Sequence, residues 1–336
     1  MTIIANLTML NQYSDYLQPR YDKFPHGRYA SLLIVRKTES ETIFRTEGSG
    51  EGLVKEIVTA GANSNNAVPM RRVMISKRKQ TAVERRTGRE LLREHELLKM
   101  AIANKKEQIC ALNTNAPCGK CIDCMLYGYA VGGGGAQKSR VMTDDAYSIG
   151  PVAQVTGRRT FNATFDNGTM RNPFTDAPST SINEDEYVLP ETHFLDIETL
   201  KDVTLGELQY VIGNILRSSR YGAISSRLGR VRNTLAAIVF SDTEIFSNLE
   251  LTQHVYDILK EDKEELDFPL VDGQVLEAVH EATNKLLSQV VGRMPTVLRD
   301  DVLKQVLNET ITLYRNVDDV KTFLAEVDRG YSVNGK

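Results

Sequence analysis

The apolar positions of this chain follow two periods, one typical of strands and one typical of helices. The continuous apolar run at 32–35 (LLIV) predicts a buried strand, and residues 29–46 as a whole predict two strands joined by a turn. Residues 204–219 carry apolar side chains every three or four positions, which predicts an amphipathic helix. The stretch VRNTLAAIVF (231–240) predicts a central strand.

The remaining segments extend this mixture of strands and helices. Residues 82–106 have helical spacing, residues 71–79 fit a short strand or a loop, and residues 155–195 predict a long β-hairpin arm. In that arm TGRRTFNATF runs outward, HFLDIETL returns, and the polar stretch between them forms the tip. Interleaved strands and helices predict the α+β class, with a βαββαβ sheet split by insertions. Further helices are expected at 250–265, 272–292, 296–315 and 317–328.

The composition is that of a globular protein with a sizeable core. The chain has 336 residues, of which 25% are charged and 41% hydrophobic. Its apolar runs stay well below the roughly 18 residues of a membrane span, so no membrane association is expected. The N-terminal stretch lacks a basic leader, so we expect no signal peptide and a cytoplasmic location.

All four cysteines of the chain lie in one segment of fifteen residues, CALNTNAPCGKCIDC. Two overlapping CxxC steps with one cysteine upstream suit a tetrahedral metal, and the cytosol keeps thiols reduced. A closed shell of four thiolates leaves no open position for catalysis. Three alternatives stay open: an iron–sulfur cluster, free buried cysteines, and His95 as a ligand in place of Cys110. We expect a structural zinc site with four ligands, Cys110, Cys118, Cys121 and Cys124.

The net charge of −3 hides an uneven distribution along the chain. Nine lysines and arginines between Arg71 and Arg93 face only two acids, Glu84 and Glu90, and residues 217–232 carry five arginines and no acid. The region after residue 241 has acidic runs such as EDKEELD. A basic surface beside an acidic remainder is typical of a protein that holds phosphates on one side, so we expect contact with a nucleic-acid backbone. The alternative is an ordinary solvated helix face.

Two runs, SRVMTDDAYSI (139–149) and RSSRYGAISSRLGRV (217–231), make the sequence resemble a known family. Together with the helix, glycine turn and strand of 205–240 and the cysteines inside an insertion, they resemble the backbone subunit of type I-D CRISPR interference complexes. That subunit is a member of the Cas-seven family within the RAMP superfamily. The resemblance extends over most of the chain.

The resemblance implies an α+β fold with four parts. These are a modified RRM-like, or ferredoxin-like, palm, a zinc-containing insertion, a β-hairpin thumb and a helical C-terminal region packed on the palm. The corresponding ranges are 1–60 and 200–250 for the palm, 61–150 for the basic insertion with the cysteines, 151–199 for the thumb and 251–336 for the helical region.

The resemblance also implies a function. The chain would be a non-catalytic crRNA-binding scaffold whose copies polymerise along the guide RNA in a Cascade-like antiviral complex and support pairing between guide and target. Its partners would be guide crRNA, a target DNA strand or target RNA, further copies of itself and other CRISPR effector subunits. Because the predicted strand LLIVRK contains no aromatic residue, base reading by a typical RRM sheet is not expected.

Individual residues follow from the resemblance as well. The basic residues carried over as RNA contacts are Arg20, Lys23, Arg28, Arg71, Arg72, Lys77, Arg78, Lys79, Lys138, Arg140, Arg217, Arg220, Arg227 and Arg230. The thumb residues carried over as a wedge at a flipped base are Phe161, Phe165, Met170 and Phe174.

Two other classes of protein remain as alternatives. A metal-dependent nuclease that cuts single-stranded target at regular intervals would use Asp144, Asp145, Asp166 or Asp176. Asp144 and Asp145 are adjacent, so on a strand they point to opposite faces, and one capping acid beside one exposed acid is the simpler interpretation. The other class is a zinc-stapled protein-interaction module that binds no nucleic acid.

Overall fold

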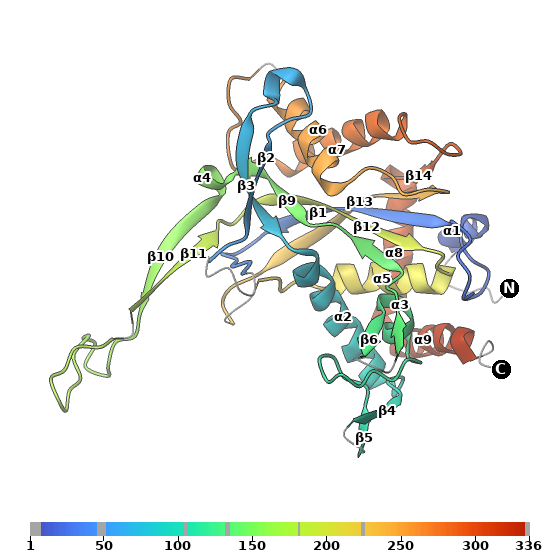
Figure 1. Ribbon diagram of the computed structural model, residues 1–336, viewed down its shortest axis with the longest axis horizontal. Coiled ribbons are helices and arrows are strands. Elements are labelled where there is room, and N and C mark those ends of the chain that lie inside the picture. Colours follow the sequence, from blue (N-terminus) through green and yellow to red (C-terminus); the bar gives the residue numbers. More distant parts are fainter. Residues whose placement is uncertain are drawn as a thin grey trace.

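The structure is a computed structural model that describes residues 8–45, 52–103, 106–131, 135–180, 182–222, 226–261 and 263–332. An eight-stranded sheet runs through the described residues, and each of its strand pairs is antiparallel (Figure 1). In spatial order the sheet contains β14 (Thr296–Leu298), β13 (Val231–Ser241), β1 (Tyr29–Thr38), β12 (His193–Lys201), β9 (Ala146–Pro151), β3 (Pro69–Ile75) and β2 (Lys55–Thr59), with β8 (Val141–Thr143) beside β12.

Helices cover both faces of this sheet (Figure 1). One face carries α6 (Asn248–Lys260) and α7 (Asp272–Leu287). The other face carries α2 (Lys77–Glu94), α3 (Ile122–Tyr127), α5 (Leu205–Arg217), α8 (Asp300–Arg315) and α9 (Val317–Ser332). The shorter elements are α1 (Thr8–Asn11), α4 (Val152–Val155), two 3₁₀ turns (Ser14–Tyr16 and Ser64–Asn66), and the small hairpins β4–β5 (Met100–Ala103 and Lys106–Ile109) and β6–β7 (Tyr129–Val131 and Gly135–Gln137).

The covering of both faces explains the unbroken apolar run in β1. Leu32 and Ile34 pack into the core beneath α5, whereas Leu33 and Val35 pack into the core beneath α6 and α7. Successive residues of a strand point to opposite faces, so a strand buried on both sides has apolar residues at consecutive positions. The strand predicted at 231–240 and the α+β class are confirmed on the same architecture.

The helix predicted at 204–219 is confirmed as α5, and its start has a clear local cause. The Thr204 hydroxyl accepts the backbone N–H of Glu207 at 3.3 Å, and the Glu207 carboxylate accepts the backbone N–H of Thr204 at 2.8 Å. This capping box satisfies backbone N–H groups that would otherwise have no partner at the start of the helix. The four C-terminal helices are also confirmed, although residues 296–298 form β14 before α8 begins.

Two predictions of secondary structure in the first third are wrong. Within the predicted segment 29–46, the described residues 29–45 form one strand rather than two, because the chain after Thr38 bends and makes only an isolated bridge from Thr42 to Val188. The helix predicted at 82–106 begins earlier, at Lys77, and ends at Glu94. Glu96 adopts a positive φ of 57°, which turns the chain out of the helix before the β4–β5 hairpin.

The predicted arm is present, but its return strand is a different segment. Strand β10 (Thr156–Asn162) pairs with β11 (Ile182–Val188), and the hairpin projects away from the body of the molecule (Figure 1). The segment HFLDIETL, expected to return along the arm, instead forms β12 and pairs with β1 in the central sheet. Residues 193–200 are buried at every position, which is the pattern of a strand covered on both faces.

Among the described residues, no helix combines the length and apolar character needed to cross a membrane.

Candidate nucleic-acid interface

The four cysteines are brought together as predicted. Their Sγ atoms all lie within 4.8 Å of one another, with 3.6 Å between Cys110 and Cys124 and 3.9 Å between Cys118 and Cys124. A tetrahedral shell with metal–sulfur bonds of about 2.3 Å has edges of about 3.8 Å, so the four sulfur atoms fit a single metal ion. The predicted alternative ligand His95 is not a member of this group; it is the residue that follows α2.

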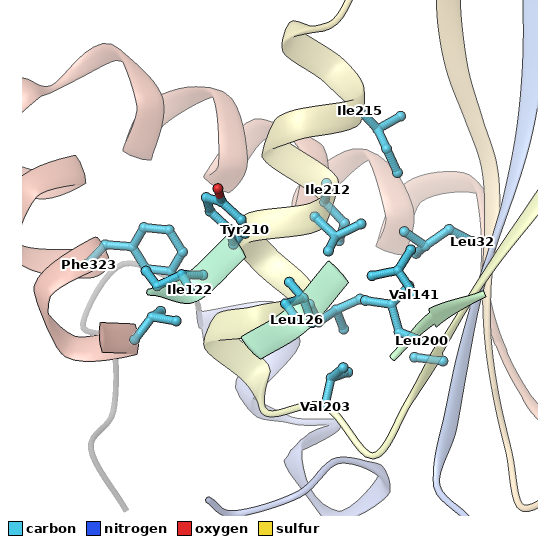
Figure 2. Close-up of a cluster of buried hydrophobic side chains, with 14 of the residues drawn as sticks. Leu32, Ile122, Leu126, Val141, Leu200, Val203, Tyr210, Ile212, Ile215 and Phe323 are labelled. Atoms are coloured by element: carbon cyan, nitrogen blue, oxygen red, sulfur yellow. The ribbon is translucent and has the colours of Figure 1, made fainter. Parts of the chain in front are cut away.

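The segment that carries the cysteines, which we call the cysteine knuckle (residues 110–128), is built into the main core. Ile122 and Leu126 of α3 pack among Tyr210 and Ile212 of α5 and Phe323 of α9 (Figure 2). The cysteine knuckle is therefore continuous with the core beneath the sheet and does not form a separate peripheral lobe.

A buried ion-pair cluster fixes the cysteine knuckle to α2. The carboxylate of Asp123 is fully buried and accepts from Arg85 at 3.0 and 2.8 Å and from Arg89 at 2.7 Å. Arg89 also donates to the backbone carbonyl of Cys110. These two arginines belong to the basic segment 71–93, and their charge is matched by an acid from a distant part of the chain.

Beside the cysteine knuckle lies a cavity of about 1110 Å³, which we call the basic cavity. Its walls come from the N-terminal loop (21–25), the cysteine knuckle, the segment 137–142, the end of β12 and the end of α9. Among its lining residues two are acidic, Asp22 and Asp202, and six are basic: Lys23, Lys99, Lys120, Lys138, Arg140 and Lys201. The excess of cations gives the lining of the basic cavity a net positive charge, which favours anions.

Both acids of the basic cavity are already engaged by the protein. The Asp202 carboxylate accepts the backbone N–H groups of His26 and Arg28 at 3.1 and 3.0 Å. Asp22 accepts the backbone N–H of Phe24 at 3.0 Å and a hydrogen bond with His26, and these bonds lower the pKa of Asp22 below its ordinary value. Neither carboxylate pairs with a lysine of the basic cavity.

The lysines of the basic cavity differ in their availability. Lys23, Lys120 and Lys138 are exposed, and none of them forms an ion pair within the described part of the chain. Lys99 is paired with Asp328 at 2.6 Å, and Lys201 lies over the ring of Tyr29 at 5.2 Å. Three cations are thus free to meet phosphate groups.

Arg140, predicted as an RNA contact, holds the floor of the basic cavity together. Its guanidinium donates to Glu207 at 2.9 Å, to the carbonyl of Asp202 at 3.1 Å and to the carbonyl of Met125 at 3.3 Å, and it stacks on the ring of Tyr21 at 5.0 Å. Only 10% of its side chain is exposed. Its charge is matched within the protein, so it positions the walls rather than offering a free cation.

Aromatic side chains complement the lysines. Phe24 is 76% exposed at the rim of the basic cavity, and Tyr129 and Tyr331 line its walls. Exposed aromatic rings beside cations are the combination that binds single-stranded nucleic acid, because bases stack on the rings while phosphates meet the lysines. Sequence reasoning missed Lys99, Lys120 and Lys201, each of which is isolated from other basic residues along the chain.

Arg72 requires a correction, because it is fully buried. Its guanidinium donates to the carbonyls of Ser148, Ile149 and Ala60 and stacks on the ring of Tyr256 at 5.2 Å. Burial lowers the pKa of Arg72 to about 10. The side chain is a structural donor inside the sheet and offers nothing to an RNA phosphate in this structure.

The other predicted RNA contacts of the N-terminal half lie at the surface. Arg28 is half-buried and donates to the carbonyls of Asp15 and Leu17. The first turn of α2 carries Lys77, Arg78 and Lys79 rather than a loop. The exposed members of this group are Arg20, Arg71, Lys77 and Arg78.

The arginines of 217–232 are exposed but partly matched in space. Arg230 pairs with Glu39 at 3.2 Å, and Arg232 pairs with Asp272. Arg220 donates to the carbonyl of Leu228 at 3.0 Å. The remaining predicted contacts of this segment, Arg217 and Arg227, are exposed. Although residues 217–232 contain no acid, acids from other segments lie beside some of these arginines in the folded molecule.

The predicted wedge residues lie on the arm. Phe174 is 94% exposed near its tip, whereas Phe165 and Met170 are half-buried among the turns of the tip. The backbone of Phe161 pairs with Asn183 in the β10–β11 ladder, and its side chain lies outside the described part of the structure. Phe174 is the member best placed to reach a neighbouring molecule.

The candidate nuclease acids do not gather into a site. Asp145 accepts the backbone N–H of Lys77 at 2.7 Å and so caps α2, while Asp144 is exposed. Asp166 and Asp176 lie on the arm, where Asp176 pairs with Arg171 at 3.2 Å. Within the described ranges, the cysteines are the one group of three or more His, Cys, Asp or Glu side chains positioned to hold a metal.

A buried charge network that the sequence did not reveal lies between the sheet and α2. Arg36 of β1 is fully buried and donates to Asp196 at 2.8 Å, to Glu84 at 2.9 Å and to Glu198 at 2.8 Å. All three carboxyl groups are also fully buried. Burial raises the pKa of Glu84 and of Glu198 above the ordinary value, because one guanidinium cannot compensate three buried negative charges.

The same network reaches the arginine-rich segment. Arg36 donates to the hydroxyl of Tyr221 at 3.0 Å and to the amide oxygen of Asn233 at 2.8 Å. The Asn233 amide nitrogen donates to the carbonyl of Ser218 at 3.0 Å. The turn that follows α5 is therefore held from beneath by side chains of the sheet.

Comparison with known protein families gives a match over most of the chain. The sequence profile of the family described as Csc2 Crispr matches residues 16–324. The chain belongs to the Csc2 family of CRISPR proteins. None of the curated proteins is detectably similar in sequence. The profile match over residues 16–324 supports the Cas-seven resemblance at the level of the family.

Solved structures agree on the fold. The crystal structure of Csc2 from Thermofilum pendens is similar with a TM-score of 0.59 and 18% identity, and the similarity covers 100% of this Csc2-family chain and 99% of that one. A chain of a CRISPR RNA-guided surveillance complex, described as pre-nicking, has a TM-score of 0.49 and 8% identity over 84% of this chain and 99% of that chain. The second likeness is too low to carry an argument.

Proposed function

We propose that this chain is the crRNA-binding backbone subunit of a Cascade-like CRISPR effector complex of type I-D. The observation that carries the proposal is the basic cavity, where Lys23, Lys120 and Lys138 are exposed and unpaired in the described structure beside the exposed ring of Phe24. Lysines that neutralise phosphates bind any sequence, which suits a scaffold that holds every guide in the same way. Base pairing between guide and target then supplies the sequence specificity.

The strand order supports an RRM-like, ferredoxin-like palm. Along the chain β1, α2, β9, β12, α5 and β13 follow the βαββαβ sequence, and in space their strands lie in the order β13–β1–β12–β9. An RRM reads RNA on the open face of its sheet. Here α6 and α7 cover that face, so the RNA contacts lie beyond the edge of the sheet, at the basic cavity.

The remaining parts of the proposal adjust the division of the chain expected from the sequence. The palm keeps 1–60 and 200–250 and also takes in α2, β9 and β12, which the expected ranges 61–150 and 151–199 had placed outside it. The insertion is then the part of 61–150 that carries the cysteine knuckle, the thumb is the β10–β11 arm, and 251–336 is the helical region. Zinc is the proposed metal of the cysteine knuckle, where its role is to hold the loop by four Cys–zinc bonds.

Polymerisation along the guide is part of the proposal. Copies that contact one another on one RNA bind it more tightly than a single copy does, because a copy held by its neighbour meets the RNA at a high effective concentration. The arm, with Phe174 exposed near its tip, projects far enough from the body to contact a neighbouring copy or the guide. Other effector subunits and the target strand complete the set of proposed partners.

The test measures RNA affinity over a series of salt concentrations. Each phosphate contact contributes about 0.7 to the slope of log affinity against log salt for a single strand, so the double variant Lys23→Ala/Lys138→Ala should lower the slope by about 1.4. The matched control is Lys304→Ala/Lys321→Ala, two exposed lysines of α8 and α9 outside the basic cavity. Equal slopes in wild type and the cavity variant would remove the basic cavity from the RNA interface.

A further inference from the structure

The cysteine knuckle supplies part of the wall of the basic cavity. Gly119 and Lys120, the two residues between Cys118 and Cys121, both line it. Lys120 is exposed, and its ammonium group forms no ion pair with the residues that the structure describes. A free cation of the proposed RNA site therefore sits between two ligands of the proposed metal site.

The two ends of the cysteine knuckle are held by contacts that do not involve sulfur. At one end the carbonyl of Cys110 accepts from Arg89. At the other end Asp123 is bound by the same arginine at 2.7 Å, and Ile122 and Leu126 are buried in the core (Figure 2). These anchors keep both ends in place whatever the state of the sulfur atoms.

The turn between the ends depends on sulfur instead. The backbone N–H of Cys118 donates to Cys110 Sγ at 3.4 Å, and the N–H groups of Lys120 and Cys121 donate to Cys118 Sγ at 3.5 and 3.3 Å. Gly119 has a φ of 65°, and a Cβ added there would lie 2.8 Å from the hydroxyl of Tyr129. The position of Lys120 is thus set by the positions of the sulfur atoms, which a bound metal fixes.

We propose that Lys120 contacts an RNA phosphate in the basic cavity and that this contact couples RNA binding to zinc binding at the cysteine knuckle. The inference rests on the proposed function, because it needs RNA in the basic cavity and zinc on the cysteines. Zinc holds the Cys118–Cys121 turn and so pre-organises Lys120 for the phosphate. RNA that binds Lys120 favours the zinc-loaded conformation by the same factor, since coupling between two sites is reciprocal.

The test measures zinc affinity by competition with a chromophoric chelator, with and without saturating single-stranded oligouridylate. In the wild-type protein RNA should raise the zinc affinity by a factor on the order of 5. Lys120→Ala should bind zinc normally without RNA, because its side chain is exposed, but RNA should no longer change its zinc affinity. Lys120→Arg should keep the coupling, and Lys304→Ala, an exposed lysine outside the basic cavity, should behave as the wild type.

The salt series gives an independent readout of the same contact. Lys120→Ala should lower the slope of log RNA affinity against log salt by about 0.7. Coupling that survives in Lys120→Ala would overturn the inference, and so would a wild-type zinc affinity that RNA leaves unchanged. In both cases the proposed function would still stand, provided that the protein binds RNA. A wild-type protein that binds no oligouridylate would overturn both.

Discussion

Replacing Arg36 with Met should destabilise the folded protein strongly although no surface contact changes. Arg36 is the single cation among Glu84, Asp196 and Glu198, and all four side chains have no exposed area. Methionine has a similar length and fills the space without a charge. The variant therefore leaves buried carboxyl groups that have lost their hydrogen-bond donor.

The magnitude follows from the cost of an uncompensated buried charge. Removing one partner of a buried ion pair costs about 3–5 kcal/mol. An entropy of unfolding of about 2.1 cal/mol/K per residue converts about 4 kcal/mol into a fall in Tm of about 6 °C for a chain of 336 residues. A change of that size is easily measured by thermal and denaturant unfolding.

Glu198→Gln is the companion variant, and its stability should depend less on pH than that of the wild type. Burial raises the pKa of Glu198 in the folded state above its ordinary value of 4.5, so the folded protein retains a proton that the unfolded chain loses. The contribution of Glu198 to stability is therefore complete below pH 4.5 and is lost as the pH rises through the folded-state pKa. Glutamine keeps a neutral side chain at every pH, so this variant should lose less stability than the wild type as the pH rises above 4.5.

Denaturant unfolding of wild type, Arg36→Met and Glu198→Gln across a pH series measures both effects. An Arg36→Met variant as stable as the wild type at neutral pH would contradict the expected cost of the lost guanidinium. A Glu198→Gln variant that loses as much stability as the wild type when the pH rises above 4.5 would show that the carboxyl group carries no raised pKa.

Two further predictions concern the cysteine knuckle and the buried Arg72. Cys118→Ser should lower the zinc content while the core stays folded, because the contacts that hold the cysteine knuckle at Asp123 and α3 do not involve Cys118. Elemental analysis measures the zinc content and circular dichroism measures the folding. Global unfolding of the variant would contradict the prediction. Arg72→Met should lower the free energy of unfolding by about 3 kcal/mol, since buried carbonyls lose their donor, and should leave RNA affinity unchanged. A fall in RNA affinity with unchanged stability would instead return Arg72 to the RNA interface.

The covered sheet argues against the mode of RNA recognition used by an open RRM sheet. Helices α6 and α7 bury the sheet face that carries Leu33 and Val35, so no row of aromatic side chains faces solvent there. The exposed ring of Phe24 and the unpaired lysines Lys23, Lys120 and Lys138 lie instead at the basic cavity, formed by loops that the sheet and the cysteine knuckle position. Loops on a rigid framework are a common place for binding residues, because the framework buries its own polar backbone while loops expose theirs.

Local features of this protein could be predicted from the amino-acid sequence. The period of the apolar residues predicted α5, β13 and the C-terminal helices, because periodicity reports which face of an element is buried. The candidate metal site could also be predicted, since Cys110, Cys118, Cys121 and Cys124 are close along the chain and short loops bring their sulfur atoms together. The family resemblance was supported by the match over residues 16–324.

Which charged residues remain without an ion-pair partner could be read only from the folded structure. Arg72 and Arg140 look like surface cations in the sequence, yet one is buried among carbonyls and the other is paired with Glu207. Lys120 looks isolated, yet folding places it in a cavity with other lysines. The segment HFLDIETL became a sheet strand for a similar reason, because its partner β1 lies far from it in the sequence.

The physical reason is the same in each case. Periodicity and short-range spacing act over a few residues, whereas burial and ion pairing depend on segments that meet only in the folded chain. Arg36 and Glu198 are 162 positions apart, and nothing near either residue in the sequence indicates the other. Most helices and strands could therefore be predicted from the local pattern, whereas the partner of each charged side chain depends on how those helices and strands pack.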